Sequence, residues 1–262
     1  MTSLPLSDLV IRDWSKNVCL VATDMDGTLT KLGKLTAELL QALENLAAAS
    51  LPVLIVTGRS AGWANGLAAY LPVVGVIAEN GGLFYPGTGE PPLFLTYLAD
   101  IEGHRKRLAT FFDSFKVEFP QIQESSDNRF RLTDWTFDVE GLTPANLQRL
   151  SFLCQEQGWG FTYSSVHCHI KPASQDKATG LLQLLSSCFP DFLPAGDRVL
   201  TVGDSPNDES LFNPNNFPMS VGVANILEYS SQLAHRPAFI TRAPEGDGFC
   251  ELAQFLIEEL NS

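Results

Sequence analysis

An apolar run, Val18-Cys19-Leu20-Val21-Ala22, leads directly into Thr23-Asp24-Met25-Asp26-Gly27-Thr28. The run predicts a buried strand, and Gly27 permits a sharp turn directly after it. Asp24 and Asp26 would then lie at the carboxyl edge of a sheet, where open α/β sheets bind ligands. The first carboxylate can attack phosphorus, and the second can serve a leaving group as acid and base. The same residues also suit a solvated Asp-Gly turn, so this pattern alone leaves both interpretations open.

Three further polar segments adjoin apolar runs in the same way. Thr57-Gly58-Arg59-Ser60 follows Val53–Val56 and offers a hydroxyl and backbone N–H groups to a phosphate oxygen. Lys177 lies just ahead of an apolar helical pattern. Gly203-Asp204-Ser205-Pro206-Asn207-Asp208 follows the apolar strand pattern Val199–Val202. The chain order is therefore acid pair, hydroxyl, lysine and acid pair.

These four segments resemble, in order and in residue type, the four motifs of the haloacid dehalogenase superfamily. The resemblance covers the chain from about Val18 to Gly248, and it is specific because four separated motifs agree. It implies that Asp24 is the nucleophile and Asp26 the general acid and base. Dehalogenases of the family lack the second acid, so Asp26 indicates an enzyme that acts on phosphate esters.

The resemblance also implies which residues bind phosphate and metal. The implied phosphate-binding residues are Thr57, Gly58, Lys177 and Asn207. The implied Mg²⁺ ligands are Asp24, the backbone carbonyl of Asp26, and Asp204, with Asp208 either a ligand or a support behind them. Independently of the family, carboxylates that converge on one sheet edge repel one another unless a cation lies among them, and oxygen ligands favour Mg²⁺. We therefore expect Mg²⁺ as the cofactor.

Composition limits the class of partner. The chain has 262 residues, of which 45% are hydrophobic, enough for one large or two modest domains. Its net charge of −13 opposes binding to nucleic acid and to anionic membranes. No stretch approaches the roughly 20 apolar residues of a membrane span, and residues 1–17 lack a signal-type apolar block. We expect a cytoplasmic protein with reduced cysteines that acts on a small phosphorylated metabolite.

The order of apolar patterns predicts an α/β fold with a Rossmann-like parallel sheet and helices on both faces. Strands at 18–22, 53–56 and 73–78 alternate with helices near 39–46 and 60–70. The pattern resumes in the second half with further expected elements. These are helices near 176–187, from 208, near 226–233 and at 249–260, and strands at 198–202, 219–223 and 238–241.

The segment between these two halves has a different pattern. A helix is expected near 101–115, two short strands within 129–139, and a helix from Thr143 to about 157. A closing hairpin is expected over 161–170. The segment is therefore predicted to be an inserted α+β cap domain, and its place between the Thr57 and Lys177 motifs resembles the type IIB cap of Cof-like and sugar-phosphate phosphatases.

The predicted domain boundaries lie near Gly82 and Pro172. The catalytic core would comprise residues 1–82 and 172–262, and the cap residues 83–171. Residues 1–17 form an additional segment before the core, in which Val10, Ile11 and Trp14 are candidates for docking on it.

Five residues are candidates for substrate contact. Arg59 follows the hydroxyl motif, and Asn80 belongs to an Asn-Gly pair that resembles one found after the third core strand in this branch. Arg129 and Arg131 would share a strand face and reach an anionic or hydroxylated substrate. Trp135 could stack on a sugar ring. Structural alternatives stay open: a solvated strand face for Arg129 and Arg131, core packing for Trp135, and a turn at Asn80.

A pair of histidines in the cap has a similar ambiguity. His167 and His169 flank Cys168 on a predicted strand, so both would lie on one face. Such a pair suggests a transition-metal site, but without a third ligand a half-exposed strand face is the commoner arrangement.

The residues together predict a Mg²⁺-dependent phosphatase that hydrolyses a small phosphomonoester, with sugar phosphates the leading class by resemblance. Asp24 would form an aspartyl-phosphate intermediate, and Asp26 would activate the water that hydrolyses it. A phosphomutase of the same superfamily would use the same motifs and is the first alternative. A non-catalytic metabolite-binding protein is the second, and the intact acid pairs and lysine argue against it.

Overall fold

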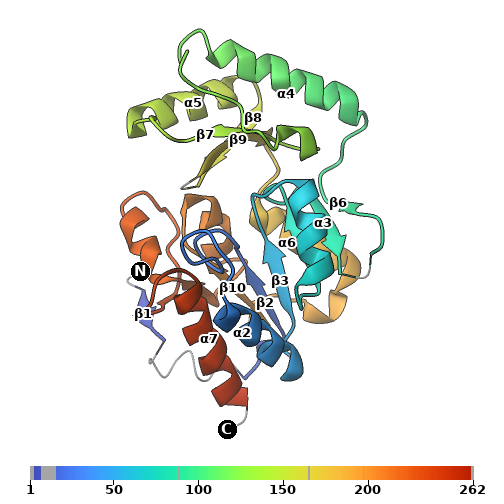
Figure 1. The fold of residues 1–262 in the computed structure, drawn as a ribbon, viewed down its shortest axis with the longest axis vertical. Coiled ribbons are helices and arrows are strands. Elements are labelled where there is room, and N and C mark those ends of the chain that lie inside the picture. Colours follow the sequence, from blue (N-terminus) through green and yellow to red (C-terminus); the bar gives the residue numbers. More distant parts are fainter. Residues whose placement is uncertain (1–2, 7–15, 88, 165, 197, 261–262) are drawn as a thin grey trace.

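The fold of the chain contains two sheets, one above the other in Figure 1. The computed structural model describes residues 3–6, 16–87, 89–164, 166–196 and 198–260. The lower sheet has nine strands and the upper one has three. Both described ends of the chain belong to the lower part, and the middle of the chain forms the upper part (Figure 1).

The main sheet runs in the spatial order β1-β12-β11-β10-β2-β3-β4-β5-β6. All pairs from β1 to β4 are parallel, and the last two pairs are antiparallel. The strands are β1 (Leu4–Pro5), β12 (Phe239–Ile240), β11 (Ser220–Gly222), β10 (Val199–Gly203), β2 (Leu20–Thr23), β3 (Val53–Val56), β4 (Gly75–Ala78), β5 (Leu83–Pro86) and β6 (Leu93–Phe94).

Helices cover both faces of this sheet because its strands are apolar on both sides. Val21 and Val53 pack in one cluster with α2, α3 and α7, whereas Leu20 and Leu54 pack in another with α6. These helices are α2 (Ala37–Ala48), α3 (Ala61–Tyr70), α6 (Lys177–Cys188) and α7 (Glu245–Leu260). Continuous burial on both faces is typical of parallel sheets between helices, and the predicted α/β fold is confirmed.

The upper part contains a three-stranded sheet in the order β7-β9-β8, with both neighbouring pairs antiparallel. Its helices α4 and α5 lie on the side away from the main sheet (Figure 1). A separate apolar cluster, which includes Phe112, Phe137 and Leu150, fills the space between them. The elements are α4 (Ile101–Phe115), β7 (Trp135–Asp138), α5 (Pro144–Glu156), β8 (Trp159–Tyr163) and β9 (His167–Pro172).

Among the described residues, four shorter helices are of the 3-10 type. They are η1 (Asn128–Phe130), η2 (Pro190–Phe192), η3 (Pro206–Phe212) and η4 (Ala224–Tyr229). The helices expected from 208 and over 226–233 are thus tighter and shorter than ordinary α-helices. No helix in the described ranges is long and apolar enough to cross a membrane.

The prediction of two short strands within 129–139 is wrong, because only β7 forms there and the preceding residues make a helical turn and a loop. The backbone N–H groups of Leu132 and Thr133 donate to the carboxylate of Glu79 instead of to a strand. Since that carboxylate belongs to the main part of the chain, a tertiary contact replaces the ladder hydrogen bonds of a strand.

The main sheet also extends beyond the boundary predicted near Gly82. Strands β5 and β6 pair with it, although both belong to the segment predicted as cap. Pairing with the main sheet thus continues past Gly82 as far as Phe94, before α4 starts at Ile101. The second predicted boundary, Pro172, is the last residue of β9. The predicted docking of Val10, Ile11 and Trp14 lies outside the described residues.

Candidate active site

Three neighbouring strands end at one edge of the main sheet. β2 pairs in parallel with β3 on one side and with β10 on the other, so their carboxyl ends lie together. Asp24 follows β2, Thr57 follows β3 and Asp204 follows β10. The backbone N–H of Asp24 donates to the carbonyl of Val202 at 2.9 Å, which fixes the first acid beside the end of β10.

Lys177 enters this edge from the first turn of α6. The side chain of Asp176 caps that helix by accepting from the N–H of Thr179 at 2.9 Å. The Lys177 Nζ lies 2.5 Å from Asp24 Oδ1 and 2.6 Å from Asp208 Oδ1, and all three side chains are buried. The structure therefore joins the first, third and fourth sequence motifs through one ammonium group.

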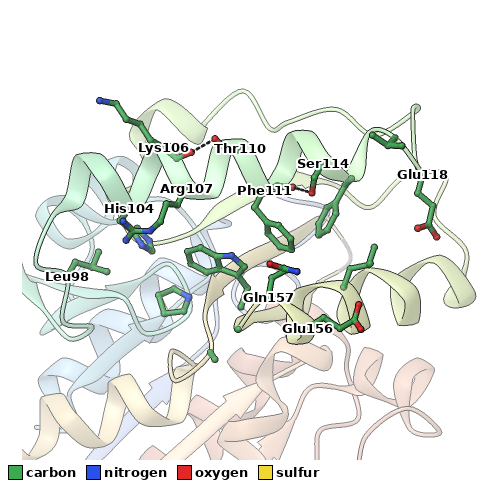
Figure 2. Close-up of a pocket in the computed structure, with 17 residues that line it drawn as sticks. Leu98, His104, Lys106, Arg107, Thr110, Phe111, Ser114, Glu118, Glu156 and Gln157 are labelled. Carbon is green, nitrogen blue, oxygen red and sulfur yellow. Dashed lines mark hydrogen bonds between the residues drawn. The ribbon is translucent and has the colours of Figure 1, made fainter.

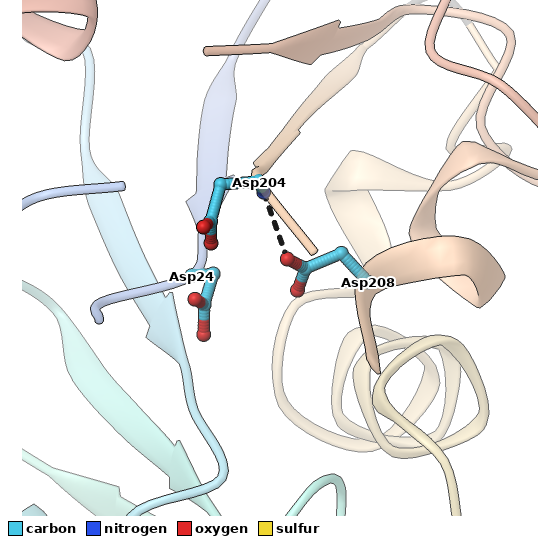
Figure 3. A group of neighbouring side chains, drawn as sticks. All are labelled: Asp24, Asp204 and Asp208. Carbon is cyan, nitrogen blue, oxygen red and sulfur yellow. Dashed lines mark hydrogen bonds between the residues drawn. The ribbon is translucent and has the colours of Figure 1, made fainter. Parts of the chain in front are cut away.

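Asp24, Asp204 and Asp208 form a compact group of carboxylates (Figure 3). One oxygen of each lies within 4.8 Å of the others. Asp208 Oδ2 accepts from the N–H groups of Asp204 and Ser205, at 2.9 and 3.2 Å. Both oxygens of Asp208 are thus engaged, one by Lys177 and one by this backbone, so Asp208 supports the site from behind more readily than it could ligate a metal.

The side chain of Asp204 is held on both of its oxygens. Thr28 donates to Oδ1 at 3.1 Å, and Asn225 donates to Oδ2 at 2.8 Å. A Cβ placed on Gly27 would lie 2.4 Å from Asp204 Oδ2, and the φ of Gly27 is +80°. Both the close approach of Asp204 and the positive φ therefore require glycine at position 27. Asn225, which follows β11 and lies in η4, is a site residue that the sequence analysis missed.

Burial and mutual repulsion raise the pKa values of Asp24 and Asp204. Desolvation and the neighbouring Asp208 raise the pKa of Asp24 to about 7, although Lys177 opposes the shift. Desolvation, with Asp208 and then Asp24, raises the pKa of Asp204 well above its ordinary value. Because the charged forms are unfavourable without a further cation, and the ligand atoms are hard oxygens, the residues present fit a Mg²⁺ ion.

Asp26 lies in a different arrangement from Asp24. The guanidinium of Arg59 donates to both of its oxygens, from Nε at 2.7 Å and from Nη2 at 2.6 Å. The Thr57 hydroxyl is buried and accepts from the backbone N–H of Arg59 at 3.1 Å. Arg59, a substrate candidate, thus lies at the site and orients the second acid.

Gly58 and Asn80 lie against each other beside the acid pair. A Cβ on Gly58 would come within 3.2 Å of both polar atoms of the Asn80 amide. That amide is buried, and neither its oxygen nor its nitrogen has a hydrogen-bond partner among the described residues. An unpartnered buried amide at this position is consistent with a substrate-binding role for Asn80.

The upper sheet closes the site from above. Ser164, Val166, His167 and His169 meet the lower residues around a cavity of about 20 Å³, which has room for about one water molecule. The lower residues are Asp24, Asp26, Gly58, Arg59 and Asn207. The sequence pattern predicts both histidines on one face, but nothing in that pattern connects the face with the acid pair. Neither histidine belongs to a metal-binding group within the described residues.

The remaining candidates lie elsewhere. Arg131 is buried and forms ion pairs with Asp127 and Asp134, so it is not exposed to a substrate. Trp135 packs with the cap cluster, where its ring lies 6.2 Å from Phe112 between centroids. Arg129 is exposed over the ring of Phe130, and the strand face that it was predicted to share with Arg131 does not form.

A groove of about 1120 Å³ lies between α4 and α5 (Figure 2). Phe111 and Ser114 face it from α4, and Gln157 faces it from the end of α5 (Figure 2). None of the four sequence motifs lines it. The groove is therefore separate from the site at the sheet edge.

The candidate site thus combines an acid pair and a buried lysine at one edge of the main sheet, beneath the three-stranded sheet. A family model described as haloacid dehalogenase-like hydrolase matches residues 21–91. Over these residues the chain is therefore similar to haloacid dehalogenase-like hydrolases, in agreement with the resemblance of its four motifs.

Relatives and solved structures are similar to this chain over most of its length. A phosphoglycolate phosphatase of Aeropyrum pernix is 27% identical over 253 residues, which cover 91% of this chain and 93% of that protein. A crystal structure from Thermoplasma acidophilum has a TM-score of 0.72 at 21% identity and covers 93% of this chain and 99% of that one. The sucrose-phosphatase of Synechocystis has a TM-score of 0.66 at 19% identity, with 91% and 98% covered.

Proposed function

We propose that the protein is a Mg²⁺-dependent phosphomonoesterase that acts on a small phosphorylated metabolite. The observation that carries the proposal is the buried Lys177, which contacts Asp24 at 2.5 Å while Asp26 lies two residues further along the same turn. A nucleophilic carboxylate, a cation for the phosphoryl oxygens and a second acid are the groups that phosphate-ester hydrolysis through a covalent intermediate requires.

In the proposed reaction, an Asp24 oxygen attacks phosphorus and forms a new P–O bond as the bond to the leaving oxygen breaks. Asp26 in its protonated form donates its proton to that oxygen, which departs as an alcohol. Asp26 then takes a proton from water, and the water oxygen attacks the aspartyl-phosphate to release inorganic phosphate and restore Asp24. Lys177 and Thr57 hold the phosphoryl oxygens during both steps.

Asp24, the backbone carbonyl of Asp26, and Asp204 would hold the Mg²⁺ ion. When bound, the ion supplies positive charge that screens the anionic phosphate from the anionic nucleophile. The hydrogen bonds of Thr28 and Asn225 to Asp204 support this assignment, because they fix the orientation of a ligating carboxylate.

We also propose that α4 to β9 act as a cap whose closure excludes bulk water from the acid pair. The small cavity between the two parts supports this proposal, because a phosphate ester could enter only after the cap side moves. A cytoplasmic location and the absence of a nucleic-acid partner remain predictions from composition.

Two substrate classes are candidates. The place of the inserted segment resembles the cap of sugar-phosphate phosphatases, whereas the curated relatives are named for phosphoglycolate, the phosphate ester of a small carboxylic acid. A panel of phosphate esters with Mg²⁺ present would test the proposed activity through the inorganic phosphate released. Asp24→Asn is the control variant, because it removes the nucleophile but preserves its size.

The same panel of phosphate esters distinguishes a phosphatase from the two alternative functions, a phosphomutase and a non-catalytic metabolite-binding protein. A phosphomutase would convert one phosphate ester into an isomer without net release of phosphate, which phosphorus NMR would detect. Complete inactivity of the wild-type protein towards every ester, including the activated p-nitrophenyl phosphate, would favour a non-catalytic metabolite-binding protein and contradict the proposed function.

A further inference from the structure

His169 of β9 occupies a fixed position above the acid pair. Its Nδ1 lies 2.8 Å from Asp134 Oδ2, and both side chains are buried. Arg131 donates to both oxygens of Asp134, at 2.9 and 3.0 Å. The same guanidinium nitrogen donates to the carbonyl of Gly58 at 2.9 Å. The cap imidazole is thus connected through two side chains to the backbone of the Thr57 motif.

This chain of contacts determines which ring nitrogen of His169 carries a proton. Arg131 keeps the Asp134 carboxylate ionised, and desolvation offset by Arg131 and His169 leaves the pKa of Asp134 at about 2. An ionised carboxylate only accepts hydrogen bonds, so Nδ1 of His169 is the protonated nitrogen. Burial lowers the pKa of His169 to about 4, so at neutral pH the ring is uncharged and Nε2 has a free lone pair.

The His169 ring adjoins both Gly58 and the cavity above the acid pair. A Cβ placed on Gly58 would lie 3.1 Å from His169 Cε1, and His169 lines the cavity together with Asp24 and Asp26. The hydrogen bond of the ring to Asp134 uses Nδ1, which leaves Nε2 available to a donor from outside the described residues. A lone pair at this position therefore requires a donor from whatever occupies the space between the cap and the acid pair.

The charged side chains around the cavity limit the chemical class of substrate that could supply this donor. Among the described residues that line the cavity, Arg59 is the one permanent cation, and both oxygens of Asp26 already engage it. Lys177 is engaged by Asp24 and Asp208. Within the lining of this cavity, a second carboxylate on the substrate would lie beside Asp24 and Asp26 without an unengaged side-chain cation, which is unfavourable in a buried site.

We propose that His169 is a specificity residue whose Nε2 accepts a hydrogen bond from a hydroxyl group of the leaving group. The enzyme would then prefer phosphate esters of neutral polyols or sugars to those of small carboxylic acids. This inference rests on the proposed phosphomonoesterase activity, and it assigns a role to a cap residue that the four motifs do not include.

Matched esters and matched variants test the inference. The esters are glycerol 3-phosphate, propyl phosphate, which has the same carbon chain without hydroxyl groups, and 2-phosphoglycolate. His169→Asn retains a donor near the Nδ1 position for Asp134 but removes Nε2, whereas His169→Gln places an amide oxygen near the Nε2 position. Arg149→Ala removes an exposed ion pair on α5 and serves as a control remote from the cavity.

For the wild-type enzyme, we expect kcat/KM to be higher for glycerol 3-phosphate than for propyl phosphate and for 2-phosphoglycolate. His169→Asn should lower the ratio of kcat/KM between glycerol 3-phosphate and propyl phosphate about tenfold, as the loss of one hydrogen bond predicts. His169→Gln should restore part of the ratio, and Arg149→Ala should leave it unchanged. A role of His169 in folding alone would lower both rate constants together.

Two results would overturn the inference. One is an unchanged ratio in His169→Asn when its unfolding transition matches that of the wild type. The other is faster hydrolysis of 2-phosphoglycolate than of glycerol 3-phosphate by the wild-type enzyme. Hydrolysis of p-nitrophenyl phosphate by the wild type keeps these results distinct from failure of the proposed function, which would abolish that reaction as well.

Discussion

The ammonium group of Lys177 lies between two carboxylates, 2.5 Å from Asp24 and 2.6 Å from Asp208, with no exposed surface on the lysine side chain. These contacts raise the pKa of Lys177 despite its burial, because the two carboxylates stabilise the charged amine. This one side chain therefore compensates the charge of two carboxylates that the first and fourth motifs bring together.

Lys177→Met should destabilise the metal-free protein by about 3–5 kcal/mol at pH 7, because it leaves buried carboxylates without their cation. Activity towards every phosphate ester should also fall, since all of them share the phosphoryl group. Denaturant unfolding measures the first effect, with Lys31→Met at an exposed ion pair to Asp247 as the control. Equal unfolding free energies for the two variants would argue against this account.

Asp26→Ala should impair hydrolysis in proportion to the need of the leaving group for a proton. We expect a loss of about 10²–10⁴-fold for an alkyl phosphate and a smaller loss for p-nitrophenyl phosphate, whose leaving oxygen has a low pKa. Steady-state kcat values for a series of leaving groups would measure the dependence. The same proportional loss across the series would show that Asp26 does not act as the general acid.

The proposed Mg²⁺ site leads to a prediction about Asn225, which contacts the proposed ligand Asp204 and is not itself proposed as a ligand. Chelation should abolish activity and Mg²⁺ should restore it, and Asp204→Ala should raise the Mg²⁺ concentration required. Asn225→Ala should raise it as well, by about 10–100-fold, because Asn225 orients Asp204 through a hydrogen bond of 2.8 Å. Mg²⁺ titrations of activity test this, with the exposed Asn45→Ala as control; full activity in chelator would contradict the site.

The two cap arginines should behave differently on substitution. Arg131→Ala should destabilise the protein by about 3–5 kcal/mol, because it leaves the buried Asp134 unpaired. Arg129→Ala should change stability by less than about 0.5 kcal/mol, since Arg129 is exposed. Thermal and denaturant unfolding of both variants would measure the contrast. A soluble, fully stable Arg131→Ala protein with altered substrate preference would instead restore Arg131 as a substrate-binding residue.

Acidification should weaken the fold through His169. Burial lowers the pKa of His169 from its ordinary 6.5 to about 4, so between these values the unfolded chain binds a proton that the folded one does not. Stability should therefore fall as the pH decreases from 6.5 towards 4, by about 3 kcal/mol from this residue. His169→Asn should show a shallower dependence of unfolding free energy on pH over this range, and an identical slope in both proteins would contradict the prediction.

Much of the catalytic edge is predictable from local sequence. Asp24, Thr57 and Asp204 each follow a short apolar strand, and parallel strands bring their carboxyl ends to one edge. Lys177 is likewise positioned by a helix start that its neighbour Asp176 caps. Strand propensity, the spacing of apolar residues and helix capping depend on residues close in sequence, so local sequence determines these positions.

Only the tertiary structure decided which cap residues are buried and which lie at the candidate site. Arg131 and Trp135 resemble substrate contacts in sequence, but Asp134 and the apolar cap cluster bury them. His169 and Asn225 become site residues through contacts with Asp134 and Asp204, across 35 and 21 positions of the chain. Local sequence determined that Asp24 and Asp26 lie at the edge of a sheet. Packing determined which distant side chains lie opposite Asp24 and Asp26, because burial and charge pairing are properties of the folded chain.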